Sequence, residues 1–260
     1  MKALILAAGQ GRRLWPFTTD CPKCLLSIGS RTILEQQLHY LEWAGIDEAV
    51  LVCGFGAKCI DRQLESYAGA LHIKTLYNPF YAISDNLISL WVARSEMEGP
   101  LMLLNGDGVF HPKIFQRLLR SDTTSCLMVD RKQTYDSDDM KVHLCDGRIV
   151  RIGKSLPPET VDAASIGLMK FSAAAVESLR DTLEEIISDE TAMNSYFLDG
   201  IQRLVDRGFA VDTCAVDGLP WADVDTPEDL HHVRQHALNF QLDAPLAQDS
   251  PLYRAAKGNA

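Results

Sequence analysis

The chain has 260 residues, of which 47% are hydrophobic and 23% are charged, as expected for a globular protein with one large α/β core or two small ones. The formal net charge of −10 argues against a nucleic acid partner, because a phosphate backbone is bound by a basic surface. No apolar run is long enough to cross a membrane and the N-terminus lacks the pattern of a signal peptide, so we expect a cytoplasmic protein with no membrane partner.

Seven cysteines are spread along the chain, and their odd number and apolar surroundings favour reduced thiols. Cys21 and Cys24 have C-x-x-C spacing but lie in a proline-containing loop, whereas a redox motif opens a helix. A zinc site would need a second pair of ligands, and His232 and His236 are too far along the chain for finger-type spacing. We therefore assign no metal or redox role to these thiols.

The first half of the chain alternates strand and helix patterns. Apolar runs predict strands at residues 3–8, 48–53, 71–77 and 101–105, and helical patterns fall between them at 33–44, 58–67 and 86–95. Thr32 and Glu35 predict a capping box before the first helix, and Ser84 or Asp85 is the expected cap of the third. This β-α-β-α-β order predicts parallel strands joined by right-handed crossovers.

The second half has a different character. Asp146-Gly147 is a type I′ turn signal and predicts a β-hairpin from residues 141–145 and 148–152. Thr226-Pro227, followed by two acidic residues, predicts the start of the last helix. The other expected elements are a short helix from residue 111, strands at 125–130, 164–171 and 210–216, and helices at 172–187 and 197–207.

No internal repeat or linker divides the chain, so we expect a single domain over residues 1–242 with the β-hairpin as an insert. Its predicted fold class is α/β, a Rossmann-like, mostly parallel twisted sheet flanked by helices. Residues 243–260 lose periodicity and are expected to form a C-terminal tail, either disordered or a contact of a possible homodimer.

Features suited to a polyphosphate are concentrated in the turn after the first strand. Gly9 and Gly11 allow a ligand to approach the backbone closely, and Arg13 and Lys23 supply positive charge. The turn lacks the G-x-x-x-x-G-K-[ST] pattern of a P-loop. It also departs from the dinucleotide fingerprint, because Leu14 occupies the position of the third glycine.

The stretch from residue 6 to residue 26, LAAGQGRRLWPFTTDCPKCLL, resembles the signature of the nucleotidyltransferases that activate sugar phosphates and related alcohol phosphates. That signature reads L-A-A-G-x-G-x-R-L-x-P-x-T, followed by P-K-x-L, and every fixed position is filled here. The resemblance extends to Asp107 at a strand end and to V-D-T-P-E-D-L at 224–230, and so covers most of the chain up to residue 242. It implies a nucleotide-diphospho-sugar transferase-like fold.

The resemblance also implies a reaction in which an NTP and a phosphorylated small molecule give a nucleotide conjugate and pyrophosphate. Arg13 and Lys23 are then the catalytic cations that grip the phosphates. The residues implied in nucleotide binding are Leu6, Ala7, Ala8, Gly9, Gly11 and Asn86. Because the attacking group is already an anionic oxygen, the absence of an obvious nucleophile–base set is expected.

A divalent cation, Mg²⁺, is implied by the same family. Mg²⁺ is usually held by one or two carboxylates together with phosphate oxygens and water. Asp107 follows a central strand, at the edge where such sheets bind ligands. The family pattern points to Asp225 as the second ligand, with Asp223 as the alternative.

The segment NPFYAISDNLISLW, residues 78–91, resembles the branch that cytidylates phosphocholine and small phosphonates such as 2-aminoethylphosphonate. This implies CTP as the nucleotide and Ser89, Lys141 and Lys154 as substrate-binding residues. Many relatives carry a Glu where this chain has Ala164. Two alternatives stay open: a sugar-1-phosphate nucleotidyltransferase that uses UTP, dTTP or GTP, and a non-catalytic nucleotide-sensing regulatory protein.

Overall fold

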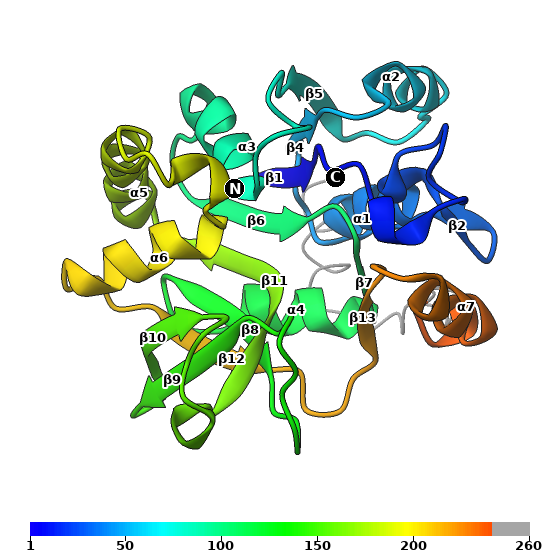
Figure 1. The fold of residues 1–260 in the computed structure, drawn as a ribbon. Coiled ribbons are helices and arrows are strands. Elements are labelled where there is room, and N and C mark those ends of the chain that lie inside the picture. The colour runs from blue at the N-terminus through cyan, green and yellow to red at the C-terminus, as the bar shows by residue number, and fades with distance from the viewer. Residues whose placement is uncertain (241–260) are drawn as a thin grey trace, which may run out of the picture.

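A nine-stranded sheet runs through residues 1–240, the part of the chain that the computed structural model describes. Its strands lie in the order β5-β4-β1-β6-β11-β8-β12-β10-β9 (Figure 1). Their bounds are β1 (Lys2–Ala7), β4 (Glu48–Cys53), β5 (His72–Tyr77), β6 (Leu101–Asn105), β8 (Cys126–Asp130), β9 (Lys141–Cys145), β10 (Arg148–Gly153), β11 (Ala163–Phe171) and β12 (Asp212–Ala215).

The sheet is parallel in its first half and mixed in its second. β5, β4, β1 and β6 are all parallel neighbours, which confirms the parallel strands predicted from the β-α-β order. β11 then runs antiparallel between β6 and β8, and β9 and β10 form the predicted hairpin, with Asp146 and Gly147 both at positive φ. The mostly parallel arrangement therefore holds for the N-terminal half alone, because the returning strand and the hairpin reverse direction.

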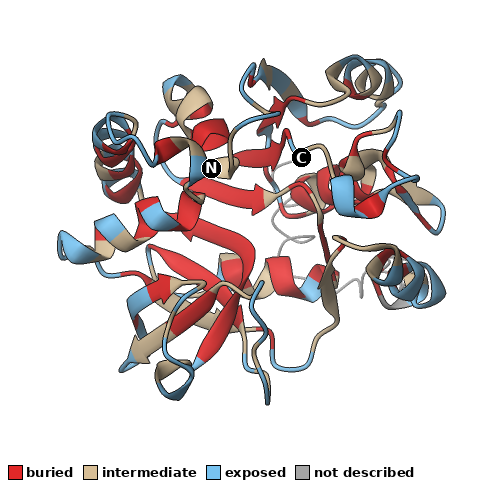
Figure 2. Cartoon of the chain, viewed as in Figure 1, coloured by how far each residue is buried: buried red, intermediate tan, exposed pale blue. Residues whose placement is uncertain are grey.

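Helices cover both faces of the sheet. One face carries α3 (Asn86–Val92), α5 (Ala173–Ile186) and α6 (Phe197–Asp206), and the other carries α1 (Ile33–Trp43), α2 (Ala57–Glu65) and α4 (Pro112–Arg120). Alternate residues of β1 point to the two cores: Leu4 and Leu6 to the first, Ala3 and Ile5 to the second. Strands buried on both faces read as continuous apolar runs, and the central strands are accordingly buried throughout (Figure 2).

Two small sheets lie outside the main one, and the sequence patterns did not predict them. β2 (Ser27–Ile28) pairs with β3 (Arg31–Thr32), and β7 (Gly108–Phe110) pairs antiparallel with β13 (Trp221–Asp223). Next to β13, α7 (Pro227–Gln235) begins at the predicted Thr226 cap and packs in a third apolar cluster with Leu14 and Val109. Short 3₁₀ helices occupy Arg12–Leu14, Lys23–Leu25, Ala93–Glu96, Pro158–Thr160, Ala192–Asn194 and Ala237–Phe240.

Most predicted element boundaries agree with the structure to within a few residues. The helix expected at 86–95 is an α-helix only to Val92 and continues as a 3₁₀ turn. Asp85 occupies the N-cap position, as predicted, although its side chain makes no capping hydrogen bond. The expected tail at 243–260 lies outside the described residues. No helix within residues 1–240 is long and apolar enough to cross a membrane.

The capping box before α1 allows a direct test of local stability. The Thr32 hydroxyl accepts a hydrogen bond from the Glu35 N–H, and the Glu35 carboxylate accepts one from the Thr32 N–H. Thr32→Ala should lower the free energy of unfolding by about 1 kcal/mol, measured by urea denaturation. Thr32→Ser keeps a hydroxyl and should stay close to the parent. Equal stability of the Ala and Ser variants would contradict this role for the cap.

Candidate active site

The loop after β1 is fixed against the segment that carries Lys23. Gly11 has φ +59°, and a Cβ there would lie 3.3 Å from Thr18 Cγ2 and 3.4 Å from Lys23 Cβ. The buried Thr18 hydroxyl donates a hydrogen bond of 2.7 Å to the Gly11 carbonyl oxygen. Glycine and threonine at these two positions therefore hold the loop and the lysine segment together.

A cavity of about 460 Å³ opens beside this loop, between the carboxyl ends of β1 and β6 and the start of α3. All five predicted nucleotide-binding residues of the loop line it, namely Leu6, Ala7, Ala8, Gly9 and Gly11. A Cβ placed on Gly9 would meet no atom within 4 Å, so the space above the loop is open to a ligand. Gly106, after β6, is packed instead: a Cβ there would lie 2.6 Å from Ala7 Cβ.

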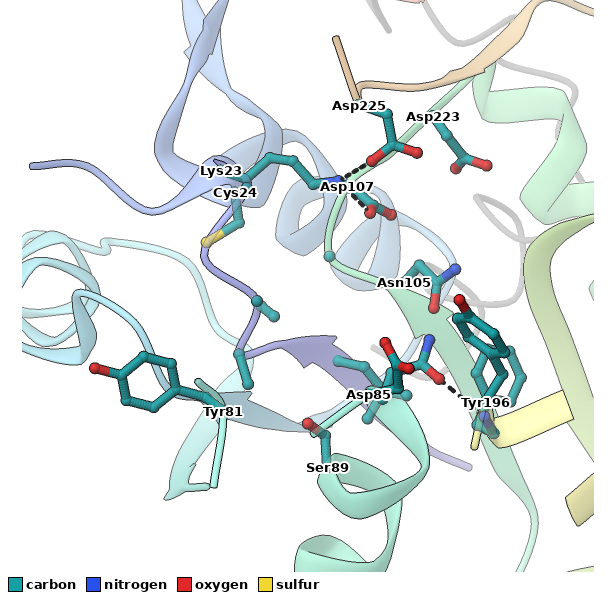
Figure 3. A pocket seen from close by; sticks show the side chains of 18 of the residues that line it. Lys23, Cys24, Tyr81, Asp85, Ser89, Asn105, Asp107, Tyr196, Asp223 and Asp225 are labelled. Carbon is teal, nitrogen blue, oxygen red and sulfur yellow. Dashed lines mark hydrogen bonds and ion pairs between the residues drawn. The ribbon is translucent and has the colours of Figure 1, made fainter. Parts of the chain in front are cut away.

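Lys23 is the central charge of the cavity. Its Nζ lies 2.6 Å from Asp107 Oδ2 and 2.6 Å from Asp225 Oδ1 (Figure 3). Burial lowers the pKa of Lys23, but the attraction of the two carboxylates outweighs burial, so its pKa lies above the ordinary value. The ammonium is thus held charged while largely removed from solvent.

Arg13 extends the same network towards solvent. Its Nη2 lies 3.0 Å from Asp225 Oδ2, and its Nη1 lies 2.6 Å from Asp138 Oδ2. The side chain is half exposed, so its guanidinium is free to exchange these partners for an incoming anion at little cost in desolvation. Burial raises the pKa of Asp225, but Lys23 and Arg13 lower it by more, so this carboxyl has a reduced pKa.

Asp107 and Asp223 each have one carboxylate oxygen without a partner in the described part of the chain. The Oδ1 atom of each is buried, and no donor within residues 1–240 forms a hydrogen bond with it. Burial, and then repulsion from Asp107 and Asp225, hold the pKa of Asp223 well above its ordinary value. Unsatisfied buried carboxylate oxygens are costly, and a bound cation would relieve that cost. Hard oxygen ligands of this kind suit Mg²⁺.

The side chains of this site do not by themselves form a complete set of metal ligands within the described residues. Within residues 1–240, no group of three or more His, Cys, Asp or Glu side chains is arranged to hold a metal ion. Two carboxylates facing an open cavity instead fit a cation that is also held by phosphate oxygens and water. Asp225 differs from the other two acids, since both of its oxygens are engaged by Lys23 and Arg13.

The two acids are brought together by a strand pair that the sequence did not reveal. In the β7–β13 pairing, Asp223 lies opposite Gly108, the residue after Asp107. The Val224 N–H also donates to the Asp107 carbonyl oxygen at 3.2 Å. Segments more than 110 residues apart in the chain are thereby joined at the edge of the sheet where its parallel strands end. Three-residue strands are too short to give a periodic signal.

The residues predicted on the α3 side also line the cavity, with different surroundings. Asn86 Oδ1 accepts a hydrogen bond of 2.8 Å from the Phe197 N–H. Ser89 is buried and accepts from Asn78 Nδ2 at 3.0 Å, so its hydroxyl supports the cavity floor. The Lys154 Nζ lies 3.3 Å from the Tyr196 hydroxyl and 3.4 Å from Asp138 Oδ1.

Lys141 is the exception among the predicted substrate-binding residues. It is buried outside the cavity lining, and its ammonium donates to the backbone carbonyls of Asp136, Asp139 and Lys154. A lysine whose donors are all used by carbonyl groups holds a loop in place and does not meet a ligand. Lys141 thus positions the 136–139 loop, which carries Asp138 to Arg13.

The lining residues that sequence reasoning did not assign to the site include Asp85, Asn105, Asp138 and Tyr196. Asp138 lies in a loop rich in aspartates, where no pattern singles out one member. Asn105 ends a predicted strand just before Gly106-Asp107, so its place at the sheet edge was a usable signal. Tyr196 precedes a predicted helix and acts as its cap.

Comparison with known proteins decides which family has this site. A sequence model for the MobA-like NTP transferase domain matches residues 3–204. The chain belongs to this family. The match covers the glycine loop, Lys23 and Asp107 of this NTP transferase, and it ends before Asp223 and Asp225.

Several proteins resemble this NTP transferase over most of its length. A CMP-5'-(3-aminopropyl)phosphonate synthase of Streptomyces rubellomurinus is 28% identical over 95% of this chain and 40% of that protein. A CTP:phosphoglutamine cytidylyltransferase of Campylobacter jejuni is 25% identical over 88% of this chain and 98% of its own. The chain spans about half the length of other curated relatives, with shares of 55% and 52%.

The fold is shared with solved structures. The CTP:phosphocholine cytidylyltransferase of Streptococcus pneumoniae superimposes with a TM-score of 0.76 and 21% identity, over 91% of this chain and 98% of that chain. A UDP-glucose pyrophosphorylase superimposes with a TM-score of 0.75. These likenesses confirm the expected nucleotide-diphospho-sugar transferase-like fold.

Removing the central cation tests the site. Lys23→Ala leaves Asp107, Asp223 and Asp225 facing the cavity without their ammonium, so the site repels a triphosphate. We expect pyrophosphate release to fall at least about 100-fold, with the far-ultraviolet circular dichroism of the parent retained. Lys58→Ala removes an exposed lysine from α2 and is the matched control. Near-parental turnover of Lys23→Ala would mean that this lysine has no part in catalysis.

Proposed function

We propose that the protein is a Mg²⁺-dependent cytidylyltransferase that joins CMP to a small phosphorylated alcohol or phosphonate and releases pyrophosphate. The observation that carries the proposal is the pair of ion pairs that Lys23 forms with Asp107 and Asp225 beside the glycine loop. The choice of nucleotide and acceptor is supported by relatives named as cytidylyltransferases for phosphoglutamine, choline phosphate and 2-aminoethylphosphonate, and by a relative named as a CMP-5'-(3-aminopropyl)phosphonate synthase.

The proposed nucleotidyl transfer mainly requires that the negative charge of the phosphates be offset. An oxygen of the acceptor phosphate or phosphonate attacks the α-phosphorus of CTP, and the bond from that phosphorus to the bridging oxygen of pyrophosphate breaks. The attacking oxygen is already anionic, so no general base is required. Two polyanions must nevertheless approach each other, and negative charge grows on the departing pyrophosphate. Lys23 and Arg13 lie where they can offset that charge.

The two cations have different tasks in this account. Lys23 is largely buried and fixed by two carboxylates, so it holds a constant position near the α-phosphorus. Arg13 is half exposed and is paired with Asp138 and Asp225, so it is suited to follow the leaving phosphates. Lys154, which faces the cavity from the other side, is suited to the acceptor phosphate.

Mg²⁺ would be held by Asp107 and Asp223, each of which has a buried oxygen with no donor among the residues that the structure describes. Asp225, to which the family pattern points as the second ligand, is less suited to this role than Asp223, because Lys23 and Arg13 occupy its oxygens. When bound, the ion neutralises phosphate charge and fixes the orientation of the triphosphate. We further propose that residues 1–242 form one nucleotidyltransferase domain, since the sheet of the described part continues from β5 to β9 without a break.

A screen of nucleotides against acceptors tests the proposed activity. We expect pyrophosphate release with CTP and with phosphocholine or 2-aminoethylphosphonate, and rates at least about tenfold lower with UTP, GTP or dTTP. Turnover confined to a sugar 1-phosphate with UTP, dTTP or GTP would refute the cytidylyl assignment and favour the sugar-nucleotide alternative. Nucleotide binding without pyrophosphate release from any acceptor would favour a regulatory protein.

Dependence on the metal provides a separate prediction. Turnover should stop in excess EDTA and return with added Mg²⁺. Asp223→Asn should raise the Mg²⁺ concentration needed for half-maximal rate by about tenfold or more, because one charged ligand is lost. Asp61→Asn, at an exposed position on α2, is the control and should match the parent. Full activity in EDTA would contradict a metal role for these acids.

A further inference from the structure

A second cavity of about 560 Å³ adjoins the active site and shares Arg13, Asn105, Asp223 and Asp225 with it. It lies on the side of the metal-binding acids away from the glycine loop, between the ends of β8 and β13 and the 136–139 loop. None of the nucleotide-binding residues of the loop lines it. The cavity is therefore placed to receive the part of the acceptor that extends away from the reacting phosphorus.

The lining of this cavity is strongly acidic. Among the described residues that line it, the cations are Arg13 and Lys132, whereas the aspartates are Asp130, Asp136, Asp138, Asp139, Asp223, Asp225 and Asp229. Arg13 is paired with Asp138 and Asp225, and Lys132 lies 2.7 Å from Asp139 Oδ1. The remaining charge is negative, which disfavours an anionic head group and favours a cationic one.

Asp130 has one carboxylate oxygen that is available to a ligand. It is the last residue of β8, and its Oδ2 accepts a hydrogen bond of 2.9 Å from Trp221 Nε1. Its other oxygen has no donor among the described residues. The bond to the indole fixes both side chains, so the free oxygen and the Trp221 ring are held together at the cavity wall.

The Trp221 ring already has an ammonium near it. The Lys132 Nζ lies 5.4 Å from the centre of the ring, within the range of a cation–π contact. A substrate ammonium between Asp130 and this ring would be attracted by the π-face of Trp221, as Lys132 is, and also by the Asp130 carboxylate. Met140 and Leu198, which line both cavities, supply apolar surface for a short carbon chain or for methyl groups.

The strand fixes the distance between the two ends of such an acceptor. Trp221 and Asp223 are two residues apart on β13, so their side chains lie on the same face, about 6.6 Å apart along the strand. Asp223 lines both cavities, whereas Trp221 lines only the second, so an acceptor with its phosphorus near Asp223 would extend its head group towards Trp221. A phosphonate or phosphate joined to an amine through two or three carbons can span these positions.

We infer that Asp130 and the Trp221 ring form a subsite for a positively charged head group, an ammonium or quaternary ammonium, on the acceptor. This inference rests on the proposed function, whose acceptors are phosphorylated alcohols or phosphonates, and it names the residues that select among them. A neutral sugar would leave the free oxygen of Asp130 without a cationic partner. Asp130 and Trp221 are thus specificity-determining residues.

The test compares an amine with its uncharged isostere. The acceptors are 2-aminoethylphosphonate and propylphosphonate, each with CTP and Mg²⁺, and the quantity measured is the ratio of their kcat/KM values. Asp130→Asn keeps an oxygen for the Trp221 N–H and removes the charge, so the ratio should fall about tenfold or more. Trp221→Leu, which removes the ring face, should lower the ratio about threefold or more. Asp61→Asn should leave it at the parental value.

The outcomes separate this inference from the proposed function. A ratio unchanged in Asp130→Asn and in a folded Trp221→Leu, judged by thermal melting, would overturn the subsite. If no acceptor releases pyrophosphate from CTP, the proposed function fails, and calorimetry then decides the subsite alone. Parental protein with Mg²⁺ should bind 2-aminoethylphosphonate at least about tenfold more tightly than propylphosphonate, and Asp130→Asn should not. Equal affinities would overturn the inference.

Discussion

The ion pairs of Lys23 with Asp107 and Asp225 are the interaction on which the rest of the site depends. They join three segments that are distant in sequence: the lysine loop, the end of β6 and the approach to α7. The Lys23 ammonium lies between the two carboxylates and offsets the cost of burying their charges. The two carboxylates in turn raise the pKa of Lys23, so the ammonium stays charged. Removing one member would leave uncompensated charge, which is costly away from water.

The surrounding architecture holds these groups in register. Gly11 and Thr18 fix the lysine segment to the glycine loop, Gly106 packs closely on β1, and the β7–β13 pair places Asp223 beside Asp107. The apolar cluster beneath α7 supports this strand pair through Val109 and Val224. Charged side chains are therefore supported by packed backbone, as a preorganised electrostatic site requires.

Much of the fold could be predicted from the sequence, because its signals are local. The apolar runs of β1 and β4, the Thr32 and Thr226 caps and the Asp-Gly turn each reflect nearest neighbours in the chain. The glycine loop and Lys23 could be identified because they stand at fixed positions of a sequence signature. Asp107 could be identified because it follows a predicted strand. The proposed roles of Asp223 and Asp130 depend on pairings of β13 and β8 across the fold, which sequence periodicity cannot report. Lys141 was predicted to bind substrate from its resemblance to the cytidylyltransferase branch. In the structure its ammonium instead donates hydrogen bonds to the backbone carbonyls of Asp136 and Lys154.

Under the proposed function, the cavity edged by Asp107, Asp223 and Asp225 admits a triphosphate only when added positive charge joins Lys23 and Arg13. Calorimetric titration of the protein with CTP at a series of Mg²⁺ concentrations tests it most directly. We expect the affinity for CTP to rise at least about tenfold between EDTA and millimolar Mg²⁺, and we expect Asp107→Asn to remove most of this dependence. Equal affinity for CTP in EDTA and in Mg²⁺ would contradict it.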